Sequence, residues 1–284
     1  MMNSNEIQER QNKEIALKVQ YAARVCFNSA EKNNHFAWIA CLVSAFSVFL
    51  PNSWPMYIIN GIPCVADIFA FVFSLITSHQ VNWASKLRKF FDSYVLDIQP
   101  NQFSETELRG IREQTEKIYM RNPINAAIQI ANTGNDSPPG VRDWYVFSKS
   151  YDGINAQFEC QRQNTWWNSK MVTVRIITTV FILILVGSIL VVLLPNNSIL
   201  NILLCSAGIL IKICERVIDN WRYFRISRLI EGAQQAIEVH PTAEGVKKLQ
   251  NLIDERRSIN VLEFGYFHKK LANKLSGLYK NISL

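Results

Sequence analysis

The chain has 284 residues, of which 49% are apolar and 19% are charged, and it carries a net charge of +7 at pH 7. Its length would fit one or two domains, and because the apolar residues are collected in long runs, the average hydropathy does not decide the class of protein. The basic residues flank those runs, where anionic lipid headgroups attract them. The charge therefore needs no nucleic acid to explain it, and we expect no direct binding of DNA or RNA.

The first predicted element is an amphipathic helix over residues 6–32. Ile15, Val19 and Ala22 recur at steps of three and four residues between charged positions, which is the spacing of one helix face. We expect this helix to pack against a cytoplasmic domain. A helix lying on the membrane surface is the alternative, less favoured because the apolar face is small and the polar face carries as much Glu as Lys.

Four apolar runs follow, at residues 36–50, 56–78, 176–194 and 198–213. The third has no charged residue and is long enough for a helix, rising ~1.5 Å per residue, to cross ~30 Å of hydrocarbon. The other runs, taken alone, also fit buried core helices. The turn sequences LPNSWP and LPNNS connect the runs in pairs, so we predict two membrane hairpins.

The distribution of lysine and arginine predicts the topology. These residues are concentrated before residue 36, between the two hairpins and from Lys212 onward, and neither hairpin turn contains one. The positive-inside bias therefore places both termini and the central region in the cytoplasm. The predicted fold is a mainly α integral membrane protein, with four transmembrane helices in two hairpins and a helical cytoplasmic domain. Its expected divisions are an N-terminal cytoplasmic helix at 1–35, hairpins at 36–78 and 171–214, a central cytoplasmic region at 79–170 and C-terminal cytoplasmic helices at 215–284.

Further helices are predicted in the cytoplasmic parts. Ser104 and Glu107 form a capping-box pattern, which predicts a helix from there to about Ala131. The sequence TGNDSPPG predicts a loop, and residues 141–151 fit either a strand or a helix. The remaining predicted helices run from Ala156 into the third span, from the fourth span to the stop at His240-Pro241, over residues 242–260 and over residues 262–278.

No common catalytic motif is present in the sequence. The patterns GxxxxGK[ST], GxGxxG, HExxH and GxSxG are absent, and each of them would have indicated a specific chemistry. The six cysteines and four histidines show no metal-ligand spacing. We therefore expect a protein that is not an enzyme and that holds no cofactor and no metal.

Asp67 is the most unusual residue of the predicted spans, because it lies near the middle of the second apolar run. A carboxylate at mid-bilayer costs a few kcal/mol, so such residues usually face a bundle interior, a partner or water. Asp67 therefore either lines a polar path or an oligomer interface, or it lies off-centre, neutral or hydrogen-bonded, because Pro63 interrupts the span.

The stretch CQRQNTWWNSKM is a polar segment directly before the third span. Trp166 and Trp167 suit the headgroup layer of a membrane boundary. Gln161, Arg162 and Asn164 carry fixed donors that suit a second backbone segment or a ligand. We expect Gln161, Asn164 and the two tryptophans to couple movements of the cytoplasmic domain to the membrane.

Three stretches resemble the SMODS-associating four-transmembrane effector family. They are RQNKEIALKVQYAARVCFNSAEK before the first hairpin, KFFDSYVLDI after it and CQRQNTWWNSKM before the second. The resemblance covers nearly the whole chain in order, and it departs from the family pattern at Asn168, where an acidic residue is usual. The matched positions are Gln11, Asn12, Ala22, Ala23, Arg24, Phe91, Asp92, Cys160, Gln161, Arg162, Asn164 and Trp167.

This resemblance implies a bacterial inner-membrane effector of anti-phage defence. In such systems a partner nucleotidyltransferase makes a cyclic oligonucleotide on infection, and the effector senses this messenger and damages the membrane, which halts the infected cell. We expect a homo-oligomer embedded in the lipid bilayer. Guanidinium groups bind phosphates and aromatic faces stack on bases. On that basis the expected messenger contacts are Arg142, Trp144, Tyr145 and Arg162.

Two other functional classes stay open at this point. A constitutive channel or transporter would use Asp67, although the chain is short and other polar residues within the spans are scarce. A non-catalytic membrane scaffold would use the cytoplasmic domain to recruit a protein partner.

Overall fold

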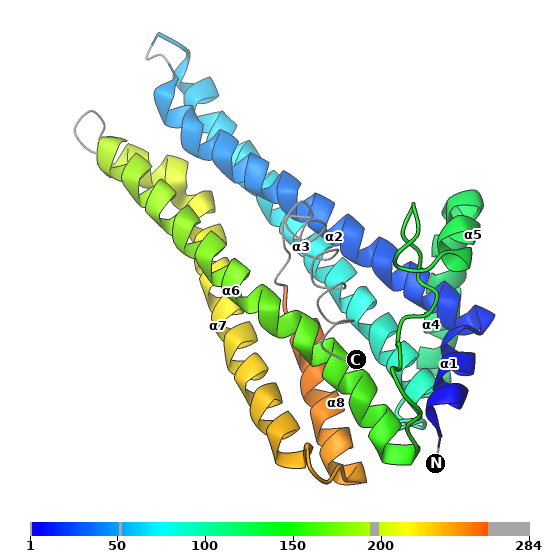
Figure 1. The fold of residues 1–284 in the computed structure, drawn as a ribbon. Helices are drawn as coiled ribbons and strands as arrows, with labels where there is room; N and C mark the ends of the chain where they lie inside the picture. Colours follow the sequence, from blue (N-terminus) through cyan, green and yellow to red (C-terminus); the bar gives the residue numbers. More distant parts are fainter. Residues whose placement is uncertain (1, 51–52, 194–198, 261–284) are drawn as a thin grey trace.

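The computed structural model describes residues 2–50, 53–193 and 199–260, and this part of the chain is almost entirely helical (Figure 1). No strand is formed among these residues, which contain only an isolated bridge between Thr133 and Arg142. The prediction of a mainly α fold is therefore confirmed. The helices are α1 (Ser4–Gln11), α2 (Glu14–Phe46), η1 (Ser47–Phe49), α3 (Met56–Leu96), α4 (Glu105–Arg121), α5 (Pro123–Ala131), α6 (Gly153–Leu193), α7 (Ile199–Ile237) and α8 (Ala243–Arg257).

Four long helices form two hairpins, α2 with α3 and α6 with α7 (Figure 1). The ends of α2 and α6 and the starts of α3 and α7 lie together at one end of the molecule, which we call the hairpin end, and the short helices α1, α4, α5 and α8 lie away from it, in a part that we name the body. A cluster of buried apolar residues packs the two hairpins on each other: Cys41, Ala70, Val186, Ile209 and Ile213.

Side-chain caps and a proline explain where the shorter helices begin and end. The predicted capping box at Ser104 is formed and begins α4. Pro123 lacks the backbone N–H that a helix interior requires, and the side chain of Asn122 caps a new helix there. The single helix predicted from Ser104 to Ala131 is therefore wrong, and the chain forms α4 and α5 instead. The helix predicted after Thr242 is confirmed as α8.

The amphipathic helix predicted at residues 6–32 is also divided. Helix α1 ends at Gln11, and α2 begins at Glu14 after one extended residue. Asn12 explains the break, because its side chain donates a 2.7 Å hydrogen bond from Nδ2 to Oδ1 of the distant Asp143. Residues 141–151, which fitted either a strand or a helix, form neither.

Within the described residues, Tyr57–Leu96 of α3 is the one helix long and apolar enough to cross a membrane by itself, and the apolar helix Arg175–Ser188 within α6 is shorter. Only 17% of the most apolar part of α3 is buried, which is unlike the core helix of a soluble protein. The end of the predicted third span at residue 194, the second hairpin turn and the helix predicted at 262–278 lie outside the described residues.

The long helices connect the body to the hairpin end without interruption. The divisions expected after residues 35, 78, 170 and 214 fall inside α2, α3, α6 and α7. At ~1.5 Å per residue, α3 is about 60 Å long, roughly twice the thickness of the hydrocarbon layer. Each of these helices therefore links the body directly to the other end of the molecule, and α3 continues through Pro63.

Candidate functional site

The loop between α5 and α6, residues 132–152, crosses the body and is held by side chains of the N-terminal helices (Figure 1). We name it the central loop. Gln11 makes two hydrogen bonds to the backbone of Tyr145, donating to its carbonyl oxygen at 3.0 Å and accepting from its N–H at 2.7 Å. Arg24 donates to the carbonyl oxygen of Gly140 at 2.6 Å. The central loop is therefore fixed to helices that lie far from it in the sequence.

A buried carboxylate, Asp92 of α3, joins the central loop to α8. Asp92 is 1% exposed. Its Oδ1 accepts a 2.8 Å hydrogen bond from the hydroxyl of Tyr145, and its Oδ2 accepts from Gln250 at 2.9 Å and from Arg257 at 2.6 Å. A buried carboxylate is tolerated only where charges and donors satisfy it in this way. Asp92 therefore holds three separate segments of the body together.

Burial and charge set the protonation states around Asp92. Burial and the negative charge of Asp92 raise the pKa of Tyr145 well above its ordinary value, so the phenol keeps the proton that it donates. Burial alone would lower the pKa of Arg257, but the carboxylates of Asp92 and Asp254 outweigh it and raise that pKa. Burial also raises the pKa of Asp254 to about 6. Asp254 therefore changes its charge near neutral pH.

The polar segment of α6 completes this arrangement. Asn164 Nδ2 donates to the hydroxyl of Tyr145 at 2.9 Å, and Gln161 Nε2 donates to the carbonyl oxygen of Val246 at 2.9 Å. Gln161 also donates to Gln250 Oε1 at 3.0 Å. Of the two alternatives for these amides, a second backbone segment or a ligand, Gln161 meets the first. We refer to the connected residues as the Asp92 network: Asp92, Tyr145, Gln161, Asn164, Gln250, Asp254 and Arg257.

The other predicted residues of this α6 segment lie outside the Asp92 network. Arg162 forms an ion pair with Glu159 on the same helix, with 2.8 Å between NH2 and Oε2. Trp166 is half-buried. The side chain of Trp167 lies outside the described residues.

Three arginines gather at the central loop, and we name Arg24, Arg88 and Arg142 the arginine cluster. The guanidinium of Arg88 lies 4.1 Å from the ring centroid of Trp144, a cation–π contact. Burial, together with the charges of Arg257 and Arg24, lowers the pKa of Arg88 to about 9. In the part of the chain that the structure describes, Arg88 has no ion-pair partner, and Nε of Arg142 is buried without a hydrogen-bond acceptor. Arg88 and Arg142 therefore keep capacity to bind an anion, whereas Arg24 already donates to the carbonyl oxygens of Pro139 and Gly140.

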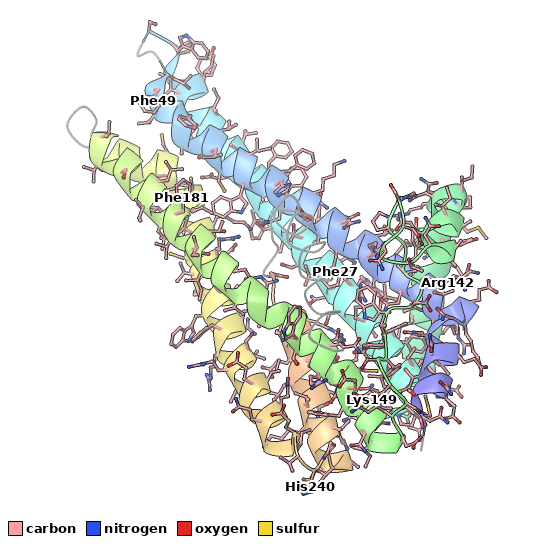
Figure 2. All side chains as sticks on the ribbon, viewed as in Figure 1. Phe27, Phe49, Arg142, Lys149, Phe181 and His240 are labelled. Atoms are coloured by element: carbon pink, nitrogen blue, oxygen red, sulfur yellow. The ribbon has the colours of Figure 1, made fainter. Side chains whose placement is uncertain are left out.

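Asp67 lies far from the body, on the part of α3 near the hairpin end. Its carboxylate packs against Gly208 of α7, so it faces the interior between the two hairpins. Figure 2 shows the wide separation between the labelled Arg142 in the body and Phe49 and Phe181 on the two hairpins. Any ligand signal from the arginine cluster must therefore travel along the long helices.

A comparison with protein-family models decides the class of this chain. The model described as the SMODS-associating 4TM effector domain matches residues 5–277. The chain belongs to this family. It is thus a membrane effector of nucleotide-signalling defence systems, associated with SMODS nucleotidyltransferases. The findings show no enzyme family, and no curated protein and no solved structure matches the chain.

Family motifs that are separate in the sequence of this effector meet at the central loop. Gln11, Asn12 and Arg24 bind its backbone or side chains, while Asp92, Gln161 and Asn164 belong to the Asp92 network. Sequence reasoning did not propose Arg24 or Arg88 as ligand residues. Arg88 lies four residues before Asp92 on one face of α3, and this spacing was the signal available to find it.

Proposed function

We propose that this effector is switched by a cyclic oligonucleotide from a packed resting state to a state that permeabilises the inner membrane and arrests or kills the infected cell, and that it acts as a homo-oligomer. The observation that carries the proposal is the arginine cluster, in which Arg88 of α3 and Arg142 of the central loop have unmatched capacity, at a loop bound to the helices that lead into the membrane. Family membership supports the class of signal.

The proposed messenger site is the arginine cluster with Trp144. Arg88 and Arg142 would bind phosphate oxygens, since guanidinium groups make strong charge-assisted hydrogen bonds to phosphate. Trp144 would stack on a base once Arg88 turns toward the phosphate, because every base offers a flat face to an aromatic ring. Tyr145 and Arg162 stay candidate contacts, but in the resting state Tyr145 is buried and Arg162 is paired with Glu159.

The connection to the membrane is the Asp92 network. A ligand that draws Arg142 and Trp144 together displaces their neighbour Tyr145, whose hydroxyl contacts both Asp92 of α3 and Asn164 of α6. Both helices continue into the hairpins. A ligand shifts such an equilibrium only by its difference in affinity for the two states, and moving the closed fraction from 99% to 1% takes about 5.5 kcal/mol. Two or three new arginine–phosphate contacts supply free energy of that order.

Liposome leakage tests the proposal. The full chain is reconstituted with an enclosed dye, and a panel of cyclic di- and trinucleotides is added. We expect leakage with a subset of the panel, and we expect Arg88→Gln to weaken its binding by roughly 10- to 100-fold, as removal of one charged hydrogen-bond partner does. Arg112→Gln is the matched control, because Arg112 is exposed on α4.

Two results would contradict the proposal. If no cyclic nucleotide of the panel increases leakage, the chain is not a messenger-gated effector. If Arg88→Gln and Arg112→Gln respond alike, the messenger binds elsewhere.

A further inference from the structure

Polar side chains in the membrane part of the protein are directed at the surface where the two hairpins meet. Ser44 of α2 donates to the carbonyl oxygen of Cys205 of α7 at 3.1 Å. Lys212 of α7 donates from Nζ to Oγ of Ser74 of α3 at 2.8 Å. Between these two contacts, Asp67 of α3 packs on α7. We name this surface the seam: Ser44, Asp67, Ser74, Gly208 and Lys212.

The outward faces of the same helices have the opposite character. Ile68, Phe69 and Phe71 of α3 are more than half exposed, as is Ile184 of α6. These side chains are suited to contact with lipid tails and have no polar group that could bind water or ions. Among the described residues, polar groups at this level therefore lie mainly along the seam, and a water-filled path would follow it.

Asp67 and Gly208 make the closest contact of the seam. A Cβ atom added to Gly208 would lie 2.1 Å from Oδ1 of Asp67, 2.8 Å from Cγ and 3.3 Å from Oδ2. Rotation about the Cβ–Cγ bond would leave Cγ in place at 2.8 Å, so relief of the clash requires the whole Asp67 side chain or the two helices to move. Gly208 is therefore the residue that allows the two hairpins to pack together at Asp67.

The same contact makes the closed seam costly. Oδ1 of Asp67 is buried and has no hydrogen-bond partner among the described residues, although the Ser44 side chain and the Gly208 backbone lie close to the carboxyl group. An unsatisfied buried polar atom is destabilising, and it is more so at membrane depth. Parting of the hairpins would admit water to this oxygen and remove that cost. The apolar cluster around Cys41 and Ile209 opposes the parting, so the seam has one closed and one hydrated arrangement.

We infer that the seam between the two hairpins of one chain is the path by which water and small ions cross the membrane, and that the packing of Asp67 on Gly208 is its point of closure. This inference rests on the proposed permeabilising function and adds the place where permeation occurs. A messenger that moves α3 and α6 in the body would part the hairpins there.

Glycine substitutions test the inference without any messenger. Gly208→Ala forces the hairpins apart, and we expect basal dye leakage from liposomes to rise at least tenfold. Gly187→Ala is the matched control, because Gly187 lies in the apolar part of α6 and a Cβ there meets nothing within 4 Å. The double variant Asp67→Ala with Gly208→Ala removes the clash and is expected to return leakage to the basal level, which separates gating from misfolding.

A crosslink provides a second test. Ser44→Cys places a thiol next to the backbone carbonyl of native Cys205, and oxidation in the presence of a short dithiol linker would then join the two hairpins through mixed disulfides. We expect oxidation to abolish messenger-triggered leakage and reduction to restore it. In the control variant, Ser44→Cys combined with Cys205→Ala, neither treatment should change the leakage.

The outcomes separate the two proposals. If wild-type protein leaks on messenger addition but Gly208→Ala behaves as Gly187→Ala does, or the crosslinked protein still leaks, the path lies elsewhere, such as between chains, and the inference is overturned. If Gly208→Ala leaks and no messenger acts on the wild type, the seam is the path and the proposed trigger is wrong.

Discussion

The body and the membrane part of this effector are held together in different ways. In the body, the carboxylate of Asp92 accepts three hydrogen bonds, one of them from Arg257. In the seam, Oδ1 of Asp67 is buried with no partner among the described residues, and the fit depends on a glycine. Asp92 is buried whereas Asp67 is only half-buried, so two carboxylates of the same helix have different surroundings. On our proposal, the body stabilises the resting state and the seam is the place where the structure opens.

The largest expected effect comes from breaking the body at Asp92. Asp92→Ala leaves Arg257 buried without its main partner, which costs about 3–5 kcal/mol for such pairs. We expect a large fall in the thermal unfolding midpoint, measured in detergent, with membrane insertion retained. Asn135→Ala, at an exposed position of the central loop, should leave the midpoint unchanged. An unaltered midpoint for Asp92→Ala would show that the network is not what stabilises the body.

A smaller change at the same place sharpens the comparison. Tyr145→Phe removes one hydroxyl and leaves Asp92 and Asn164 each short of one hydrogen bond, a cost of about 1–3 kcal/mol. Because this loosens only the resting state, we expect the messenger concentration for half-maximal leakage to fall by about 5- to 100-fold. Tyr57→Phe, at an exposed end of the first hairpin, serves as the control. If both variants reach half-maximal leakage at the same messenger concentration, the Tyr145 hydroxyl has no role in gating.

The smallest expected effect is a dependence on pH. Burial raises the pKa of Asp254 to about 6, above the ~3.9 of an unfolded chain. The folded state therefore binds more protons between these values, so this group lowers stability as the pH rises from 4 to 6. Asp254→Asn removes the titration, and we expect its thermal midpoint to rise relative to wild type between pH 4.5 and pH 7. A constant difference across this range would show that Asp254 does not titrate there.

Local sequence signals predicted the elements of this fold well. The capping box at Ser104 and the start of α8 at Thr242 depend on neighbours three residues away, which the sequence displays directly. The turn sequences likewise predicted the pairing of the long helices. The breaks at Asn12 and Asn122 were harder to predict. Asn12 leaves the helix because of Asp143, which is distant in the sequence.

The candidate site was predicted only in outline, for the same reason. Periodicity placed Gln161 and Asn164 on a helix before the third span, but their partners Val246 and Tyr145 lie on other segments. No local pattern shows that the carboxylate nearest in sequence, Asp92, forms its ion pair with Arg257 and not with Arg88. The sequence left two alternatives for Asp67, a polar interior or an off-centre position. Its surroundings are set by α7, which lies far along the chain and packs on it at Gly208.

The most direct test of the account measures the separation of the hairpins. Spin labels at Ser53 in the first turn and at Val191 near the end of α6, in protein whose native cysteines are replaced, report this distance by pulsed electron resonance. For a cyclic nucleotide that triggers leakage, we predict a longer distance in wild-type protein and no change in Arg88→Gln. Leakage without any change in that distance would contradict the claim that the body opens the membrane by parting the hairpins.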